Sequence, residues 1–189
     1  MQTSQSMHEK PEGGAVNASA ALAAGGETQQ YLTFSIGGEQ FALVILSIKE
    51  IIQFGHITTV PLMPDYLRGV MNLRGAVVPV IDLSARFNRG ATTPGKRTCI
   101  VIVEVNDDAE RRVIGLMVDS VSAVLEIPGA EIEPVPPLGA GIRAEFICGM
   151  ARLNGKFVVI LDVGQTFRLN EMPESRLAIA AEAEPVALH

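Results

Sequence analysis

The sequence predicts an all-β protein built from small barrels. Between the two terminal tails, glycine, proline or asparagine interrupts the chain roughly every eight to twelve residues, and the runs between these breaks are short and rich in valine and isoleucine. One such unit occurs twice along the chain, and helical spacing of apolar residues is confined to short stretches. These observations favour two small β-barrels with short helices at their corners.

Two hairpins are predicted from turn residues between apolar runs. Residues 31–36 and 40–45 flank Gly37 and Gly38, and paired glycines supply the positive φ angles of a tight two-residue turn. A second hairpin is expected from residues 99–105 and 113–118, joined across 106–112.

One stretch in the first half of the chain predicts a helix. Within residues 46–53, Ile48, Ile51 and Ile52 recur at helical spacing. The stretch is short, as expected for the corner of a barrel.

The chain contains an internal repeat. Residues 66–82 return 80 residues later as residues 146–162, and a second echo relates 41–48 to 114–121 at a spacing of 73. Pairs of identical residues at equivalent positions are Gly69 and Gly149, Leu73 and Leu153, Gly75 and Gly155, Val78 and Val158, and Asp82 and Asp162. The chain is therefore two copies of one β unit.

Each copy reads as strand, two-residue turn, strand and an aspartate that begins a short helix. Asp82 and Asp162 are predicted to be N-caps, because a carboxylate there accepts hydrogen bonds from free amides at a helix start. Asn154 precedes glycine as a type I′ turn prefers. Arg74 takes the place of Asn154 in the first copy, where a left-handed conformation costs about 1 kcal/mol, although a type II turn would accept arginine without strain. This substitution suggests a role for the guanidinium beyond the turn.

Composition limits the partners. The chain has 189 residues with a net charge of −6, no Trp and two Tyr, which disfavours nucleic-acid and anionic-membrane binding. Cys99 and Cys148 lie in apolar runs and are expected to be free thiols, as in a reducing compartment. With no leader-like or membrane-spanning segment in the sequence, we expect a cytoplasmic protein without direct membrane insertion, whose partners are proteins or small molecules.

The expected organisation is a disordered tail (1–29), a domain (30–168) and a C-terminal tail (169–189) whose stretch 174–184 is compatible with a short helix. Within the domain, one subdomain is expected from about 31–88 plus returning C-terminal strands, and the other from about 97–150. No catalytic, metal or cofactor residues are expected. Residues 90–97 resemble a phosphate-binding loop, but Arg97 replaces the Mg²⁺-binding hydroxyl and a predicted strand follows instead of a helix. The three histidines lie far apart in the sequence.

Three segments carry a family resemblance. Residues 72–83, Asn-Leu-Arg-Gly-Ala-Val-Val-Pro-Val-Ile-Asp-Leu, resemble a characteristic motif of CheW chemotaxis coupling proteins, and residues 41–52 and 115–121 fit the same family. The resemblance runs from about residue 31 to 167. It implies two SH3-like five-stranded barrels and a non-enzymatic adaptor in two-component signalling. The implied partners are chemoreceptor tips, the regulatory domain of a CheA-type histidine kinase and other CheW-like subunits, in arrays at the membrane.

The resemblance also implies contact residues for receptor or kinase, in a mostly apolar surface suited to helix-in-groove recognition. They are Ile48, Glu50, Ile51, Gly69, Arg74, Val121 and Val124. From the sequence alone, core packing is an equal interpretation of the four aliphatic residues, and a solvated charge is the alternative for Glu50 and Arg74. The Arg74 guanidinium is expected to meet a carboxylate of a partner. A barrel that binds another ligand, or a coupler for type IV pili or another output, remains the alternative function.

Overall fold

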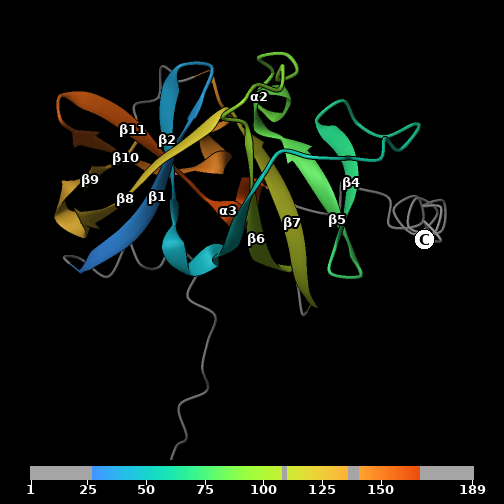
Figure 1. Cartoon of the computed structure of the whole chain (residues 1–189). Coiled ribbons are helices and arrows are strands. Elements are labelled where there is room, and N and C mark those ends of the chain that lie inside the picture. The colour runs from blue at the N-terminus through green and yellow to red at the C-terminus, as the bar shows by residue number, and fades with distance from the viewer. Residues whose placement is uncertain (1–26, 108–109, 136–140, 167–189) are drawn as a thin grey trace, which may run out of the picture.

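The strands form two sheets, seen as two bodies side by side in Figure 1. The computed structural model describes residues 27–107, 110–135 and 141–166. The first sheet has six strands in the order β8-β1-β2-β11-β10-β9. Their bounds are β1 Thr28–Ile36, β2 Glu39–Val44, β8 Ser120–Pro128, β9 Ile132–Glu133, β10 Ile147–Leu153 and β11 Lys156–Leu161.

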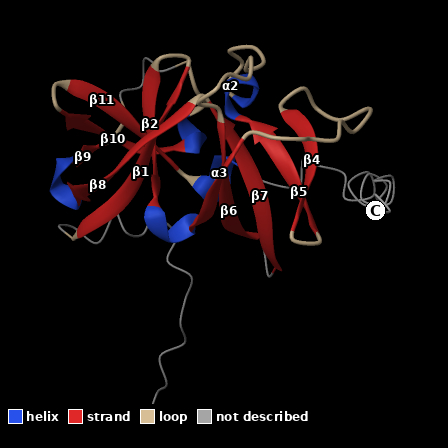
Figure 2. Ribbon diagram, viewed as in Figure 1, coloured by secondary structure: helices blue, strands red, loops and turns tan. Residues whose placement is uncertain are grey.

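The second sheet has five strands in the order β3-β6-β7-β5-β4. Their bounds are β3 Ile48–Gln53, β4 Leu67–Leu73, β5 Ala76–Asp82, β6 Cys99–Asp107 and β7 Glu110–Val118. The helical segments are single turns next to strands (Figure 2): η1 Ile45–Ser47, α2 Leu83–Arg86, η2 Gly129–Glu131, η3 Ala144–Phe146 and α3 Val163–Thr166. The predicted class of two small SH3-like barrels is confirmed, with the two-residue β9 as a sixth strand in one of them.

Both predicted hairpins are present and longer than expected, as β1–β2 and β6–β7. The predicted helix over residues 46–53 is wrong. Residues Ile45–Ser47 form one 3-10 turn and the rest is strand β3, in which burial alternates between partly buried and exposed residues. The isoleucines at 48 and 52 satisfy both a helical spacing and the two-residue period of a strand, and pairing with β6 decides for the strand.

The two repeats exchange their hairpins. Each barrel combines the first hairpin of one repeat with three long strands of the other: β1–β2 joins β8, β10 and β11, with the two-residue β9 beside β10, whereas β6–β7 joins β3, β4 and β5. The joining pairs are parallel and equivalent, Ile160 beside Ala42 in one barrel and Val80 beside Gly115 in the other. The expected grouping of residues 31–88 in one subdomain therefore differs from the structure, because the chain crosses to the other barrel after β2. Strand β1 also begins at Thr28, inside the expected tail, while most of both tails lies outside the described residues.

Alternate residues of a strand serve different cores. In β6, Ile100 and Ile102 pack inside the five-stranded barrel, while Val101 and Val103 join a large cluster shared by both barrels. Because successive side chains of a strand point to opposite faces, β6 buries one face in its own barrel and the other in the cluster shared with the neighbouring barrel. The shared cluster, the largest of the buried groups, joins the two barrels.

The junction between the barrels is built from equivalent positions of the two repeats. The backbone amide of Asp82 donates to the Tyr66 carbonyl at 2.8 Å, and that of Asp162 donates to the Phe146 carbonyl at 2.9 Å. The Arg86 guanidinium lies 4.4 Å from the centroid of the Tyr66 ring and 4.9 Å from that of Phe146. One cation thus sits against both equivalent aromatic rings and holds the two copies of the repeat together.

Candidate functional site

Arg74 and Glu50, the two charged residues predicted to contact partners, form a bidentate ion pair with each other. Arg74 Nη1 donates to Glu50 Oε1 at 2.8 Å and Nη2 donates to Oε2 at 2.9 Å. The Arg74 side chain is 77% exposed and that of Glu50 is 25% exposed. A pair so open to water contributes only about 0.2 to 1 kcal/mol to folding, but two parallel hydrogen bonds fix the orientation of both groups.

The backbone of the turn explains the position of the guanidinium. Arg74 has φ of 52° and Gly75 has φ of 84°, matching 50° and 77° at Asn154 and Gly155. Two consecutive positive φ angles define a type I′ turn and exclude the type II alternative. Arg74 therefore has a strained left-handed backbone conformation. We expected its guanidinium to meet a carboxylate of a partner, but in the structure it binds the carboxylate of Glu50 in the same chain.

The four aliphatic residues predicted as contacts occupy equivalent positions on two edge strands. Ile48 and Ile51 lie on β3, at one edge of the five-stranded sheet, and Val121 and Val124 lie on β8, at one edge of the six-stranded sheet. Ile48 and Val121 are partly buried against the shared core. Ile51 is 42% exposed and Val124 is 49% exposed. The repeat therefore presents one exposed aliphatic residue at equivalent positions of the two edge strands.

Gly69 is a buried residue of β4 that faces the backbone of Thr58. Its φ is 147°, and a Cβ atom there would stand 2.2 Å from the Thr58 carbonyl oxygen. The equivalent Gly149 also faces a neighbouring strand, with the Glu133 carbonyl oxygen 2.9 Å from a Cβ position. Any effect of Gly69 on partners therefore acts through the backbone of β4 and its approach to Thr58.

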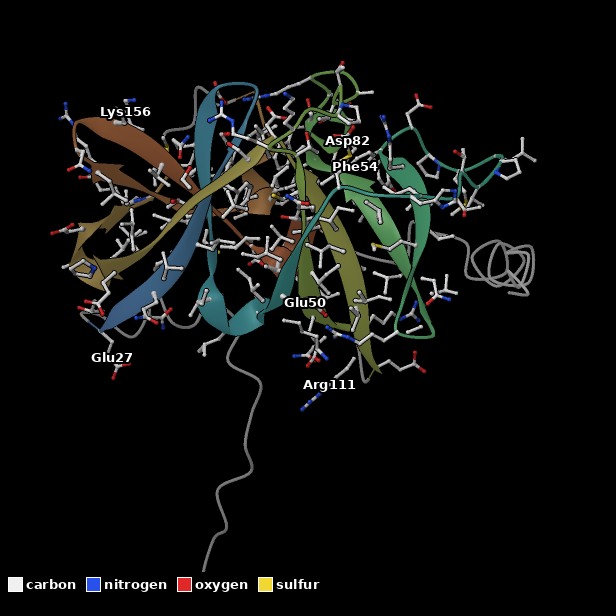
Figure 3. The ribbon with its side chains drawn as sticks, viewed as in Figure 1. Glu27, Glu50, Phe54, Asp82, Arg111 and Lys156 are labelled. Carbon is white, nitrogen blue, oxygen red and sulfur yellow. The ribbon has the colours of Figure 1, made fainter. Side chains whose placement is uncertain are left out.

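A second group of charges, which the sequence did not suggest, lies beside the first. Lys49 Nζ is 2.9 Å from Glu104 Oε2, and Arg111 Nη1 is 3.6 Å from Glu104 Oε1. The hydrogen bond from Lys49 lowers the pKa of Glu104, and the charges of Lys49 and Arg111 add to this effect although desolvation opposes it. Figure 3 shows Glu50 and Arg111 toward the same end of the five-stranded barrel. The exposed Ile51 therefore follows Lys49 and Glu50 on β3, and each of these two residues belongs to one of the ion-pair groups.

Asp82 is buried and organises the loop that resembled a phosphate-binding segment. Its carboxylate caps α2 by accepting from the amide of Ser84, as predicted, and also accepts from the amide and hydroxyl of Thr92 at 2.7 and 2.8 Å. The loop then leads into β6 instead of a helix. Asp82 therefore has a structural role in holding this loop.

The two repeats differ beside these aspartates. Arg68 lies 3.7 Å from Asp82, whereas Cys148 takes the equivalent place beside Asp162. Burial, reinforced by the Asp162 carboxylate, raises the pKa of Cys148 to about 12. Cys148 and Cys99 are free thiols and are only partly buried. Over the described ranges, no three His, Cys, Asp or Glu side chains are placed to hold a metal ion, and no helix is long and apolar enough to span a membrane.

Two barrels with exchanged hairpins, each with an aliphatic edge strand, define a twin-barrel interaction domain. Residues 30–171 match the model of the CheW-like domain, and the chain belongs to this family. The resemblance noted in residues 72–83 is thereby confirmed.

Relatives match over most of their length. The chain is 31% identical over 149 residues to the chemotaxis protein CheW of Klebsiella aerogenes, covering 78% of this chain and 87% of the relative. It is 32% identical over 155 residues to that of Rhizobium meliloti, covering 82% and 96%, and 31% identical over 127 residues to the protein FrzA of Myxococcus xanthus, covering 67% and 76%. The crystal structure of the scaffolding protein TtCheW from Thermoanaerobacter tengcongensis has a TM-score of 0.69 at 33% identity and covers 77% of this chain and 91% of that one.

Proposed function

We propose that this protein is a non-enzymatic adaptor that couples chemoreceptors to a CheA-type histidine kinase. The carrying observation is the match to the CheW-like family across residues 30–171, which includes both barrels and every predicted contact residue. The names of the relatives, chemotaxis protein and scaffolding protein, describe the same kind of task. The protein acts in the cytoplasm and is recruited to arrays at the membrane, where other CheW-like subunits are further partners.

The duplicated edge strands support an adaptor that holds two partners at once. Ile51 on β3 and Val124 on β8 are exposed aliphatic residues, and each has a partly buried aliphatic neighbour on the same strand, Ile48 or Val121. Such residues suit the apolar face of a partner helix or strand, with nearby charges to set its register. The β3 surface adds the Glu50–Arg74 pair, so it is the more polar of the two.

Separate titrations against the receptor tip and the kinase regulatory domain test this proposal. We expect binding to both, and expect Ile51→Asp and Val124→Asp each to reduce affinity for at least one partner. Leu62→Asp is the matched control, because Leu62 is 83% exposed but lies on a loop outside the predicted contact set. A protein that binds neither partner, or that binds ATP saturably by calorimetry, would contradict the proposal.

A further inference from the structure

Phe157 is an exposed aromatic residue on a regular strand. The first residues of β11 are Lys156 and Phe157, and Phe157 pairs with Arg152 of β10. The ring is 58% exposed, and the Arg152 guanidinium lies 5.5 Å from its centroid. Figure 3 places Lys156 at the outer end of the six-stranded barrel, away from Glu50. The ring is thus apart from the Glu50–Arg74 pair and still has apolar area to bury.

The other repeat provides a reference for this position. Val77 is equivalent to Phe157, since it pairs with Asn72 as Phe157 pairs with Arg152. Val77 is partly buried, because it packs in one cluster with Val60, Val70 and Met63. The five-stranded barrel therefore covers this position with an apolar segment of its own chain, whereas in the six-stranded barrel the described residues leave the larger Phe157 side chain 58% exposed.

The charges around Phe157 also differ between the repeats. Arg152 and Lys156 replace the uncharged Asn72 and Ala76. Within the described part of the chain, neither cation has a carboxylate at ion-pairing distance, unlike Arg74, which is paired with Glu50. In a chain of net charge −6 this hairpin is a local positive site. Two unpaired cations beside an exposed ring complement a partner that carries carboxylates beside an apolar side chain.

We propose that Phe157, Arg152 and Lys156 form a third docking surface, the β11 surface, for an extended acidic segment of another protein. The segment places an aliphatic side chain on the Phe157 ring and carboxylates beside the two cations. The chain itself contains a model for such a segment. The stretch that includes Val60 and Met63 covers Val77 in the other barrel and is followed by Asp65. This surface is separate from the β3 and β8 strands to which we assign receptor and kinase contacts, so it adds a further partner.

A peptide titration of the full-length isotope-labelled protein tests the β11 surface. The probe is a blocked peptide copying residues 59–65, Thr-Val-Pro-Leu-Met-Pro-Asp. We expect saturable amide shifts confined to β10 and β11, with a dissociation constant of about 1 mM. A second peptide with Lys in place of the final Asp should bind roughly fivefold more weakly, as expected for the loss of one exposed charge contact.

Variants distinguish specific binding at the β11 surface from non-specific binding to exposed apolar residues. Phe157→Ser should abolish the shifts, and Arg152→Gln combined with Lys156→Gln should weaken binding roughly tenfold and remove its salt dependence. Leu62→Ser, which removes an exposed leucine from the other barrel, should leave binding unchanged. The same spectra report whether each variant is folded. Shifts that centre on β4 and β5, fail to saturate, or survive Phe157→Ser would overturn the proposal. Contacts between the Phe157 ring and residues 136–140 in the free protein would also overturn it, since the chain would then fill its own surface.

Discussion

Arg74 at the tip of the β4–β5 hairpin holds both carboxylate oxygens of Glu50 on β3. The pair therefore links the tip of the β4–β5 hairpin to the edge strand β3, although β3 and β4 are at opposite ends of the sheet order. Both groups remain reachable by a partner, since neither side chain is buried.

Arg74→Ala should affect partners more than folding. We expect the free energy of unfolding to change by no more than about 1 kcal/mol, because the pair is exposed. The free energy of binding to receptor or kinase should become less favourable by about 2 kcal/mol or more. Arg74→Lys should recover only part of the affinity, because an ammonium cannot make the bidentate contact. Titrations and urea denaturation measure the two effects.

Exchanging the charges distinguishes two roles for Arg74. If the pair only orients the hairpin, the double variant Glu50→Arg with Arg74→Glu should regain binding. If Arg74 also contacts a partner, the double variant should remain as weak as Arg74→Ala. Unchanged affinity of Arg74→Ala for both partners would contradict any role at an interface.

Gly69→Ala should lower stability together with binding. An added Cβ would stand 2.2 Å from the Thr58 carbonyl oxygen, at a φ of 147°, so we expect a loss of more than about 2 kcal/mol in the free energy of unfolding. Gly75→Ala is the control: its φ is 84° but nothing lies within 4 Å of a Cβ atom, so only about 1 kcal/mol should be lost. Lost binding with unchanged stability in Gly69→Ala would instead indicate direct contact.

Asp82→Asn should be more damaging than Asp162→Asn. The amide would turn a donor toward the Thr92 amide or hydroxyl, both of which donate to Asp82, and a buried mismatch of this kind costs roughly 2 to 3 kcal/mol. Asp162 accepts from the Gln165 amide at 3.0 Å as a helix cap, and its loss should cost about 1 kcal/mol. Denaturation curves measure the difference, and limited proteolysis should reveal faster cleavage at residues 88–98 only in Asp82→Asn. Equal losses of stability in the two variants would contradict the role of Asp82 in holding the loop through Thr92.

Cutting the chain within residues 88–97 should give two fragments that are each unfolded alone. Every barrel needs strands from both sides of the cut, and the shared core draws residues from both halves. Mixing the fragments should restore a cooperative thermal transition, followed by circular dichroism. Cooperative melting of either fragment by itself would show that the exchange is not needed for folding.

Local rules predicted much of this fold because turns and caps depend on neighbouring residues. The positive φ at Gly37 and Gly38, the Asn154 turn and the Asp82 cap all follow from the chemistry of a few adjacent groups. The return of C-terminal strands to the first barrel was expected, but the passage of β3, β4 and β5 into the other barrel was not, since it depends on parallel pairing between strands far apart in the chain, such as β5 with β7. Periodicity carries no information on which strands become neighbours.

The candidate site was predicted as separate residues and not as a geometry. The motif supplied Glu50 and Arg74, but their mutual contact depends on the path of β3 between the barrels. Phe157 was overlooked although comparing it with Val77 in the aligned repeats would have singled it out. The Lys49–Glu104–Arg111 group had no sequence signal, because it joins three strands.

The exchanged hairpins have a consequence for how such a protein originates. A polypeptide carrying one copy of the unit would hold a hairpin and three strands that do not complete each other. Two such polypeptides would close both barrels by trading hairpins, and that assembly would dissociate on dilution. Joining the copies in one chain makes closure independent of protein concentration, and it frees the two halves to diverge, as Arg74 and Asn154 have done.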